Sequence, residues 1–287
     1  MSATPSPHHT TSADGTQIAY WSIGSGPPLV FVVGAFNDHT TGSELAVALS
    51  FGFTVITYDR RGRGASGDAA AYAVEREIED LAAIIEAEGG MAAALGFSSG
   101  AALILMAAAQ GVPLTRLVPF EVPWIVGDSR PRPPTDIGDH LRALVEAGKR
   151  GEAVEAFQRD CVGIPEDVIV QLRGAPFREA LEAMAHTLVY EARIMGEFTV
   201  PDGLLPRVGQ PTLVLHGGKS PAWMAATAAF VAEALPDGHV EAVSDIGHDL
   251  APALAPPVAA FLGRQLRAGS QWPLSRPRSR DGLAREP

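Results

Sequence analysis

Residues 96–100, Gly-Phe-Ser-Ser-Gly, have the composition of a tight turn that carries a nucleophile. An apolar run at residues 92–95 precedes the turn, and a longer one at residues 101–109 follows it. The first run suits a buried strand and the second a buried helix, so Ser98 lies where a strand passes into a helix. The amides at the start of that helix would face the negative charge that develops on an attacked carbonyl. This arrangement predicts that Ser98 is the nucleophile of an acyl-transfer reaction.

Small residues two positions to either side of Ser98 support this prediction. A side chain at either position would collide with the strained backbone of a strand-to-helix turn, and both positions hold glycine, Gly96 and Gly100. The five-residue pattern alone also fits an inert glycine-serine turn, but the strand and helix around it favour the nucleophile. Ser99 is the less suitable of the two serines because it lies one step into the helix.

A histidine late in the chain is the candidate base. A serine hydroxyl is a poor nucleophile at neutral pH and needs a base within hydrogen-bond reach, normally a histidine oriented by a third group. Of the eight histidines, His248 follows the last expected strand, at residues 240–243, and precedes a helical pattern at residues 253–266. That place agrees with the chain order nucleophile, acid, histidine. His248 is therefore predicted to accept the proton of Ser98.

The elements that must position these residues alternate between strands and helices. This alternation is typical of an α/β fold, in which helices cover both faces of a mostly parallel sheet. Residues 75–88 form one covering helix, with apolar residues on one side and acidic residues on the other. The expected strands lie near residues 17–21, 29–33, 54–58, 92–96, 117–121, 212–216 and 240–243.

The alternation stops after the strand that ends near Glu121. Residues 122–207 carry helical patterns without a convincing strand, which predicts a helical cap inserted into one α/β core of residues 13–121 and 208–266. Residues 1–12 show no pattern of a folded element and are expected to be a disordered lead-in. The remainder, residues 267–287, is rich in Arg, Pro and Ser, so we expect a flexible tail.

Two further segments resemble parts of the α/β-hydrolase superfamily. Residues 32–36, Val-Val-Gly-Ala-Phe, resemble its oxyanion loop. Residues 58–66, Tyr-Asp-Arg-Arg-Gly-Arg-Gly-Ala-Ser, resemble the turn after its fourth strand. With the segments above, the resemblance covers nearly all residues from about 15 to 266. It implies an α/β-hydrolase fold with an inserted helical cap.

The resemblance also implies an oxyanion hole built from backbone N–H groups. These would be the amides of Ala35 and Ser99, with the amide of Phe36 as a nearby alternative. The histidine that usually precedes the oxyanion glycine in the superfamily is replaced here by Val33. Backbone donors tolerate this change, because the side chain does not supply the hydrogen bond.

The third member of the expected triad departs from the usual pattern of the superfamily. An aspartate usually follows the seventh strand, in a His-Gly-Xaa-Xaa-Asp block, and this chain has Ser220 there. Some members, including a branch of the haloalkane dehalogenases, place a glutamate directly after the sixth strand, where this chain has Glu121. A carboxylate that ends an apolar strand costs free energy unless it is paired. Glu121 is therefore predicted to orient His248. Asp245 and Asp249 are alternatives, but sequence neighbours of the histidine are badly placed to orient its ring.

One motif points to another class of enzyme. Residues 62–67, Gly-Arg-Gly-Ala-Ser-Gly, match the glycine pattern of a dinucleotide-binding turn. That turn normally follows the first strand of a βαβ unit, with an acidic residue about 20 positions further on. Here it follows a middle strand, and the next strand ends in glycine, so we expect these glycines only to shape a turn. No zinc-binding spacing is present. The predicted chemistry needs neither a metal nor a cofactor.

The composition restricts the partners. A net charge of −11 opposes binding to nucleic acid or to an anionic membrane surface. Residues 89–115 carry no charge, but glycine and serine interrupt them, which suits a buried strand and helix and not a membrane span. Cys161 is the only cysteine, so no internal disulfide can form and a cytoplasmic location is expected. The expected partner is a small-molecule substrate, and a second copy of the chain, in a homodimer, is a further candidate.

These residues together predict a serine hydrolase that acts through an acyl-enzyme on an ester, lactone or thioester of a small hydrophobic molecule. The cap is expected to roof the substrate pocket, for which the candidate wall residues are Trp124, His186, Trp223 and Met224. Two other functions remain open. One is a lyase or cyclase that uses the oxyanion hole and His248 without acylating Ser98. The other is a ligand-binding protein that kept the fold.

Overall fold

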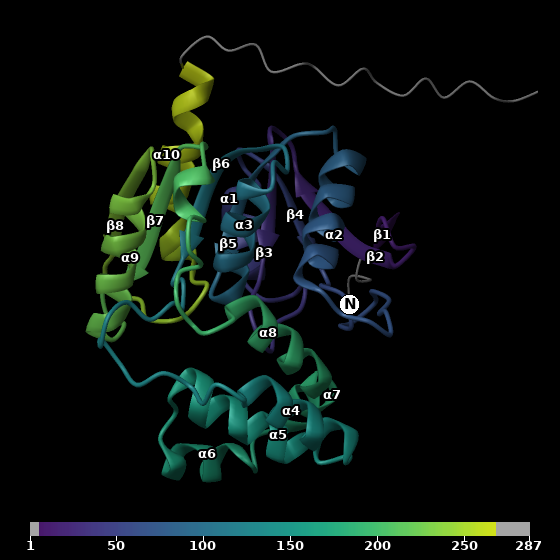
Figure 1. Cartoon of the computed structure of the whole chain (residues 1–287). Coiled ribbons are helices and arrows are strands. Elements are labelled where there is room, and N and C mark those ends of the chain that lie inside the picture. The colour runs from purple at the N-terminus through teal and green to yellow at the C-terminus, as the bar shows by residue number, and fades with distance from the viewer. Residues whose placement is uncertain (1–5, 268–287) are drawn as a thin grey trace, which may run out of the picture.

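Eight strands form one sheet in the order β1-β2-β4-β3-β5-β6-β7-β8 (Figure 1). The structure is a computed structural model, and it describes residues 6–267. The strands from β3 to β8 run parallel to one another, whereas β2 is antiparallel to both β1 and β4. The strands are β1 (His8–Thr11), β2 (Gln17–Gly24), β3 (Pro28–Val32), β4 (Thr54–Tyr58), β5 (Ala92–Phe97), β6 (Leu114–Phe120), β7 (Thr212–Gly217) and β8 (Gly238–Val243).

The predicted α/β fold is confirmed, and the predicted strands correspond to β2 through β8. In β5 every residue is buried, because the strand lies between β3 and β6 with helices over both of its faces. A continuous apolar run is the pattern that such a strand requires. The predicted nucleophile follows β5 directly, so the best-buried strand of the sheet carries it.

The N-terminal segment corrects one prediction. Residues 8–11 are not a disordered lead-in: they form β1, an edge strand in which His8 pairs with Tyr20 of β2. A tight turn that contains Gly15, with a φ of 89°, joins the two strands. The prediction failed because β1 reads His-His-Thr-Thr and has no apolar residue to mark a buried side. The start of the predicted lead-in, residues 1–5, lies outside the described residues.

Helices cover both faces of the sheet (Figure 1). On one face lie α1 (Ser43–Leu49) and α10 (Ala255–Arg267). On the other lie α2 (Val74–Ala87), α3 (Ser99–Ala109) and α9 (Ala222–Ala234). Apart from Arg267, which ends α10, the predicted flexible tail lies outside the described residues.

The hydrophobic core is divided by the sheet into two clusters. Leu29 and Phe31 of β3 pack with α1 and α10, whereas Val30 and Val32 pack with α2, α3 and α9. Successive side chains of a strand point to opposite faces, so one short apolar strand supplies both clusters. The strands from which the site loops start are thereby packed by helices on both faces.

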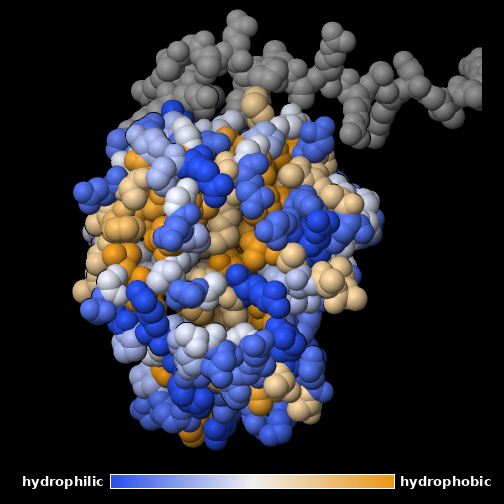
Figure 2. Space-filling model, in the orientation of Figure 1, coloured by the Kyte–Doolittle hydropathy of each residue, from blue (hydrophilic) through white to orange (hydrophobic). Residues whose placement is uncertain are grey.

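The chain between β6 and β7, residues 121–211, is helical, and the predicted insertion of residues 122–207 lies within it. Figure 1 shows α4 to α7 beyond the carboxyl end of the parallel strands, and α8 leads back toward the sheet and packs against α2 and α3. On the face shown in Figure 2, most of the insertion surface is hydrophilic. Its helices are α4 (Ile137–Glu146), α5 (Arg150–Ala156), a π-helical turn (Phe157–Val162), α6 (Glu166–Leu172), α7 (Arg178–Ala183), a 3-10 turn (Ala185–Thr187) and α8 (Leu188–Met195). Two further 3-10 turns, Leu205–Arg207 and Pro252–Leu254, precede β7 and α10 respectively. Every helix in residues 6–267 is too short or too polar to span a membrane.

Candidate active site

Ser98 occupies the connection between β5 and α3 with a φ of 57° and a ψ of −126°. Residues other than glycine rarely adopt a positive φ, so the surrounding structure must hold this turn in a strained conformation. Part of that restraint is a hydrogen bond of 3.0 Å from the Ser98 N–H to the carbonyl oxygen of Phe120, at the end of β6. The geometry is that of a nucleophile elbow. Ser98 is half-buried, whereas Ser99 is buried within the first turn of α3.

The two glycines that flank the turn are required by close backbone packing. A Cβ atom on Gly96 would lie 2.6 Å from the Ala101 Cα, and one on Gly100 would overlap the carbonyl oxygen of Val32 in β3. Neither neighbour is a flexible side chain that could move away. The small residues around Ser98 therefore allow α3 to start directly against β3 and β5.

Replacement of Gly100 by alanine is expected to destabilise the fold by about 3 kcal/mol, because overpacking of this size against backbone pushes α3 away from β3. Urea denaturation followed by circular dichroism measures the change. Gly52→Ala is the matched control, since a Cβ there meets no atom within 4 Å. If the Gly100→Ala variant were as stable as the Gly52→Ala variant, the close packing of α3 on β3 would be wrong.

Glu121 follows β6 directly, and its carboxylate makes the contact predicted for the triad acid. The Oε2 atom lies 3.1 Å from His248 Nδ1, and Oε1 accepts a hydrogen bond of 2.7 Å from the Gly217 N–H. The residue is 1% exposed. Its backbone N–H donates to the Leu215 carbonyl oxygen over 3.0 Å, so β7 holds both its backbone and its side chain. A buried carboxylate with both oxygens engaged has a fixed orientation.

The environment of Glu121 keeps it ionised. Burial raises the pKa of its carboxyl group, but the hydrogen bonds from His248 and from the Gly217 amide lower that pKa by more, so it lies below its ordinary value. Because the folded-state pKa is the lower one, the stability contributed by this carboxylate is present above the ordinary carboxyl pKa. It is lost as the pH falls through the lowered value. At neutral pH Glu121 is therefore an anion that accepts hydrogen bonds.

This contact defines the protonation of the His248 ring. Since the Glu121 carboxylate can only accept, Nδ1 carries the proton of the neutral ring and Nε2 has the free lone pair. The ring also packs on Phe97, with the ring centres 4.5 Å apart, and Phe97 immediately precedes Ser98. The structure thus brings His248, Glu121 and the Ser98 turn together, with Nε2 as the nitrogen that can take a proton.

The other candidates for the triad acid lie in less suitable places. Asp245 has a side chain that is 90% exposed and lies 3.5 Å from the Lys219 ammonium group. Asp249 is exposed and makes no side-chain contact with His248 among the described residues. At the position usual for the acid, the hydroxyl of Ser220 lies close to Gly217, the residue whose amide binds Glu121.

The loop after β3, residues 33–37, lies directly against the Ser98 turn. A Cβ atom on Gly34 would lie 2.8 Å from the Ser98 Cβ, so only glycine allows this approach. The predicted oxyanion donors Ala35, Phe36 and Ser99 have N–H groups that donate to no other group of the described chain. Unpaired amides beside the candidate nucleophile are what an oxyanion hole would require. Phe36 has a φ of 63°.

The structure contradicts one of the four predicted pocket residues. Trp124 is completely buried in the core, so its side chain packs the interior and does not line an open pocket, which corrects that prediction. Met224 is also buried, and the Arg130 guanidinium lies 4.9 Å over the Trp223 ring. The His186 ring lies between Arg150 and Asp68, at the junction of the insertion and the turn after β4. The roles of Trp223, Met224 and His186 in a pocket stay predictions.

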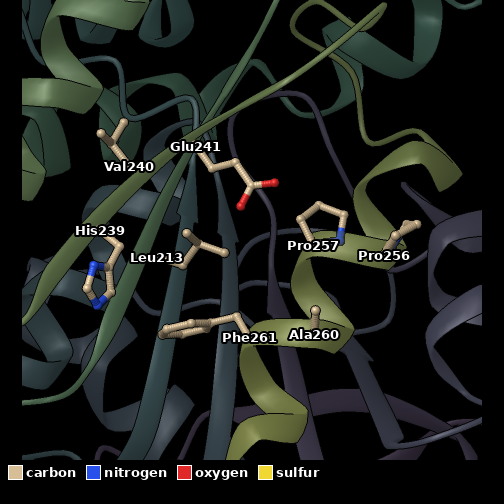
Figure 3. A pocket seen from close by; sticks show the side chains of 8 residues that line it. All are labelled: Leu213, His239, Val240, Glu241, Pro256, Pro257, Ala260 and Phe261. Atoms are coloured by element: carbon tan, nitrogen blue, oxygen red, sulfur yellow. The ribbon is translucent and has the colours of Figure 1, made fainter.

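A pocket of about 470 Å³ lies elsewhere, between the edge strand β8 and α10 (Figure 3). None of the predicted site residues lines it. Its walls are Leu213, His239, Val240, Glu241, Pro256, Pro257, Ala260 and Phe261. Within the described residues, no group of three His, Cys, Asp or Glu side chains is arranged to hold a metal ion.

The sequence did not single out the polar residues behind the oxyanion loop. Arg60, Arg63 and Asn37 donate hydrogen bonds to carbonyl oxygens of this loop, and Glu191 of α8 binds both arginines. The sequence does contain a feature that could have indicated them. Three arginines at positions 60–63, directly after an apolar strand, must be paired if they are buried.

Comparisons with known proteins identify the family. A sequence profile of the alpha/beta hydrolase family matches residues 29–264. The crystal structure of an alpha/beta hydrolase from Sphaerobacter thermophilus is 48% identical, with a TM-score of 0.85, and the match covers 89% of this chain and 100% of that chain.

Two further relatives are named as enzymes. The 2-(acetamidomethylene)succinate hydrolase of Mesorhizobium japonicum is 29% identical over 239 residues, 78% of this chain and 82% of the relative. The N-formylmaleamate deformylase of Pseudomonas putida is 29% identical over 249 residues, 83% of this chain and 88% of the relative. With the fold, the profile match and these relatives together, this chain belongs to the alpha/beta hydrolase family.

Proposed function

We propose that this protein is a serine hydrolase that cleaves an ester, lactone or thioester of a small hydrophobic molecule through an acyl-enzyme. One observation supports the proposal above all others: Ser98 lies at a strained strand-to-helix turn beside a histidine whose Nδ1 is bound by a buried carboxylate. A turn that only connected two elements would not need this strain or this buried anion.

The proposed mechanism has two steps. Ser98 Oγ attacks the substrate carbonyl while His248 Nε2 takes the hydroxyl proton, and Glu121 stabilises the imidazolium that forms. The carbonyl oxygen becomes negative and is held by the amides of Ala35 and Ser99. The tetrahedral intermediate collapses as the imidazolium protonates the leaving alcohol or thiol. Water then attacks the acyl-enzyme by the same route, releasing the acid and restoring Ser98. Each step uses only groups of the chain and water.

The insertion supports a small, enclosed substrate site. Phe36 in the oxyanion loop packs edge-to-face on Phe157 in the π-helical turn, with ring centres 5.5 Å apart. The insertion therefore extends over the oxyanion loop, where it would roof a bound acyl group. π-Helical turns are frequent at functional sites, and aromatic walls favour apolar ligands.

Fluorophosphonate labelling tests the proposed function. We expect the folded protein to gain one covalent adduct on Ser98, located by peptide mass spectrometry, and to hydrolyse p-nitrophenyl acetate or butyrate. Hydrolysis rates for a lactone, a thioester and an N-acyl compound then show which class of acyl compound the protein prefers. The N-acyl compound is included because two relatives carry names with acetamido and N-formyl groups. Absence of the adduct in folded protein would exclude the acyl-enzyme and leave a lyase, a cyclase or a ligand-binding protein.

A further inference from the structure

Two buried arginines hold the oxyanion loop from behind. Arg63 Nη1 donates to the carbonyl oxygens of Gly34, over 2.6 Å, and Asn37, over 2.9 Å. Arg60 Nη1 donates to the carbonyl oxygen of Val33 over 3.1 Å. Both arginines are at most 2% exposed. Three carbonyl groups of a five-residue loop are therefore bound to guanidinium groups that cannot exchange with water.

The bond to Gly34 acts on the peptide unit that matters for catalysis. The Gly34 carbonyl and the Ala35 N–H belong to one planar trans peptide, so they point in opposite directions. A guanidinium that fixes the oxygen therefore also fixes the direction of the Ala35 N–H. The next peptide unit is held in the same way, because Asn37 Nδ2 donates to the Ala35 carbonyl oxygen over 2.7 Å and so orients the Phe36 N–H.

The anion that holds these arginines comes from the insertion. Glu191 of α8 binds Arg63 Nη2 and, over 2.8 Å, Arg60 Nη1. Arg60 also forms a two-bond pair with Glu77 of α2, at 2.6 and 2.7 Å. The two glutamates and two arginines balance in charge, and Glu191 is fully buried. Through Glu191, the position of α8 is coupled to the oxyanion loop.

Stability alone does not account for this cluster. Replacing a buried ion pair by uncharged residues of similar volume is often neutral or stabilising, because desolvation costs as much as the pairing returns. We propose that Arg63 is a positioning residue for the oxyanion hole, and that Glu191 locks it there from the insertion. The inference rests on the proposed hydrolase function.

The charge-balanced double variant Arg63→Met/Glu191→Gln removes the guanidinium that binds the oxyanion loop together with the carboxylate that holds it. No unpaired charge is left. We expect kcat for p-nitrophenyl butyrate to fall about tenfold to a hundredfold, less than the 10²–10³ lost when an oxyanion donor is removed outright. KM should stay within about twofold, because the ground state does not use the hole. The affinity for a trifluoromethyl ketone, which places a negative oxygen in the hole, should fall in proportion to kcat. Arg63→Lys keeps the charge but loses the fork of donors. If the double variant fails to fold, Arg63→Lys should likewise lower kcat and leave KM nearly unchanged.

A second buried pair in the same turn provides the matched control. Arg61 binds Asp80 of α2 through two bonds of 2.7 Å and makes no contact with the oxyanion loop among the described residues. Arg61→Met/Asp80→Asn also removes the partner of Asp14, which Arg61 binds over 2.9 Å. This control should therefore lower the melting temperature and leave kcat within about twofold. A folded Arg63→Met/Glu191→Gln variant with wild-type kcat, or an equal kcat loss in the control pair, would overturn the positioning role. An inactive, unlabelled wild type would instead overturn the proposed function itself.

Discussion

Replacing Ser98 by alanine is expected to lower kcat for a short-chain aryl ester by about 10⁶-fold, the loss found when the nucleophile of a serine hydrolase is removed. The hydroxyl supplies the only bond to the acyl group in the proposed mechanism, so no neighbouring group can replace it. The Ser98→Ala backbone must still adopt the φ of 57°. The melting temperature should therefore change little, which separates lost chemistry from lost structure.

The adjacent serine provides the comparison for this variant. Ser99→Ala removes a buried hydroxyl that has no hydrogen-bond partner in the described structure, while the backbone amide of residue 99 remains. We expect the Ser99→Ala variant to keep the fluorophosphonate adduct, and the Ser98→Ala variant to lose it. An adduct that persisted in Ser98→Ala, with comparable turnover, would show that another residue is the nucleophile.

Glu121→Gln is expected to lower kcat by about 10⁴-fold, as in the analogous substitution of a triad aspartate. The amide has nearly the shape of the carboxylate, and its oxygen can still accept from the Gly217 N–H. Its NH₂ group would then face His248 Nδ1, which favours the ring tautomer with the proton on Nε2. In that tautomer Nε2 cannot accept the Ser98 proton, and no anion stabilises the imidazolium.

Asp245→Asn tests the alternative acid with the same change of charge. Because Asp245 is exposed and pairs with Lys219, its loss should alter kcat by no more than about twofold, as surface ion pairs contribute little. Steady-state kinetics at neutral pH, with circular dichroism of both variants, gives the comparison. Full activity in folded Glu121→Gln would remove this residue from the mechanism and return attention to Asp245.

The central strands of the sheet were predictable because they are buried on both faces. Strands such as β3 and β5 are continuous apolar runs, and a run of that length bounded by turn residues has few other uses. The edge strand β1 could not be found in this way. It is stabilised by pairing with β2 across a tight turn, and backbone pairing of this kind leaves no periodic signal in four polar residues.

The predicted roles of Ser98, His248 and Glu121 came from chain order and local context, and the structure places Glu121 against His248 and His248 against the turn that carries Ser98. For Arg60 and Arg63 behind the oxyanion loop, the local signal was the group of arginines itself, and it did not show which residues pair with them. Glu77 lies among the acidic residues that the sequence places opposite the apolar side of α2, yet it is buried against Arg60. Glu191 binds Arg63 across 128 positions of the chain. One sequence does not show which distant charges are partners.

The hydrogen bond from the Gly217 amide to Glu121 bears on how relatives of this chain are recognised. A motif search that requires an aspartate after β7 would discard this sequence as a degenerate member, since Ser220 stands at that position. The amide of Gly217 shows that the end of β7 and the end of β6 meet at one point beside His248. A carboxylate that follows either β6 or β7 can therefore reach His248. Catalogues of inactive homologues built on the β7 position should be searched again for a glutamate at the end of β6.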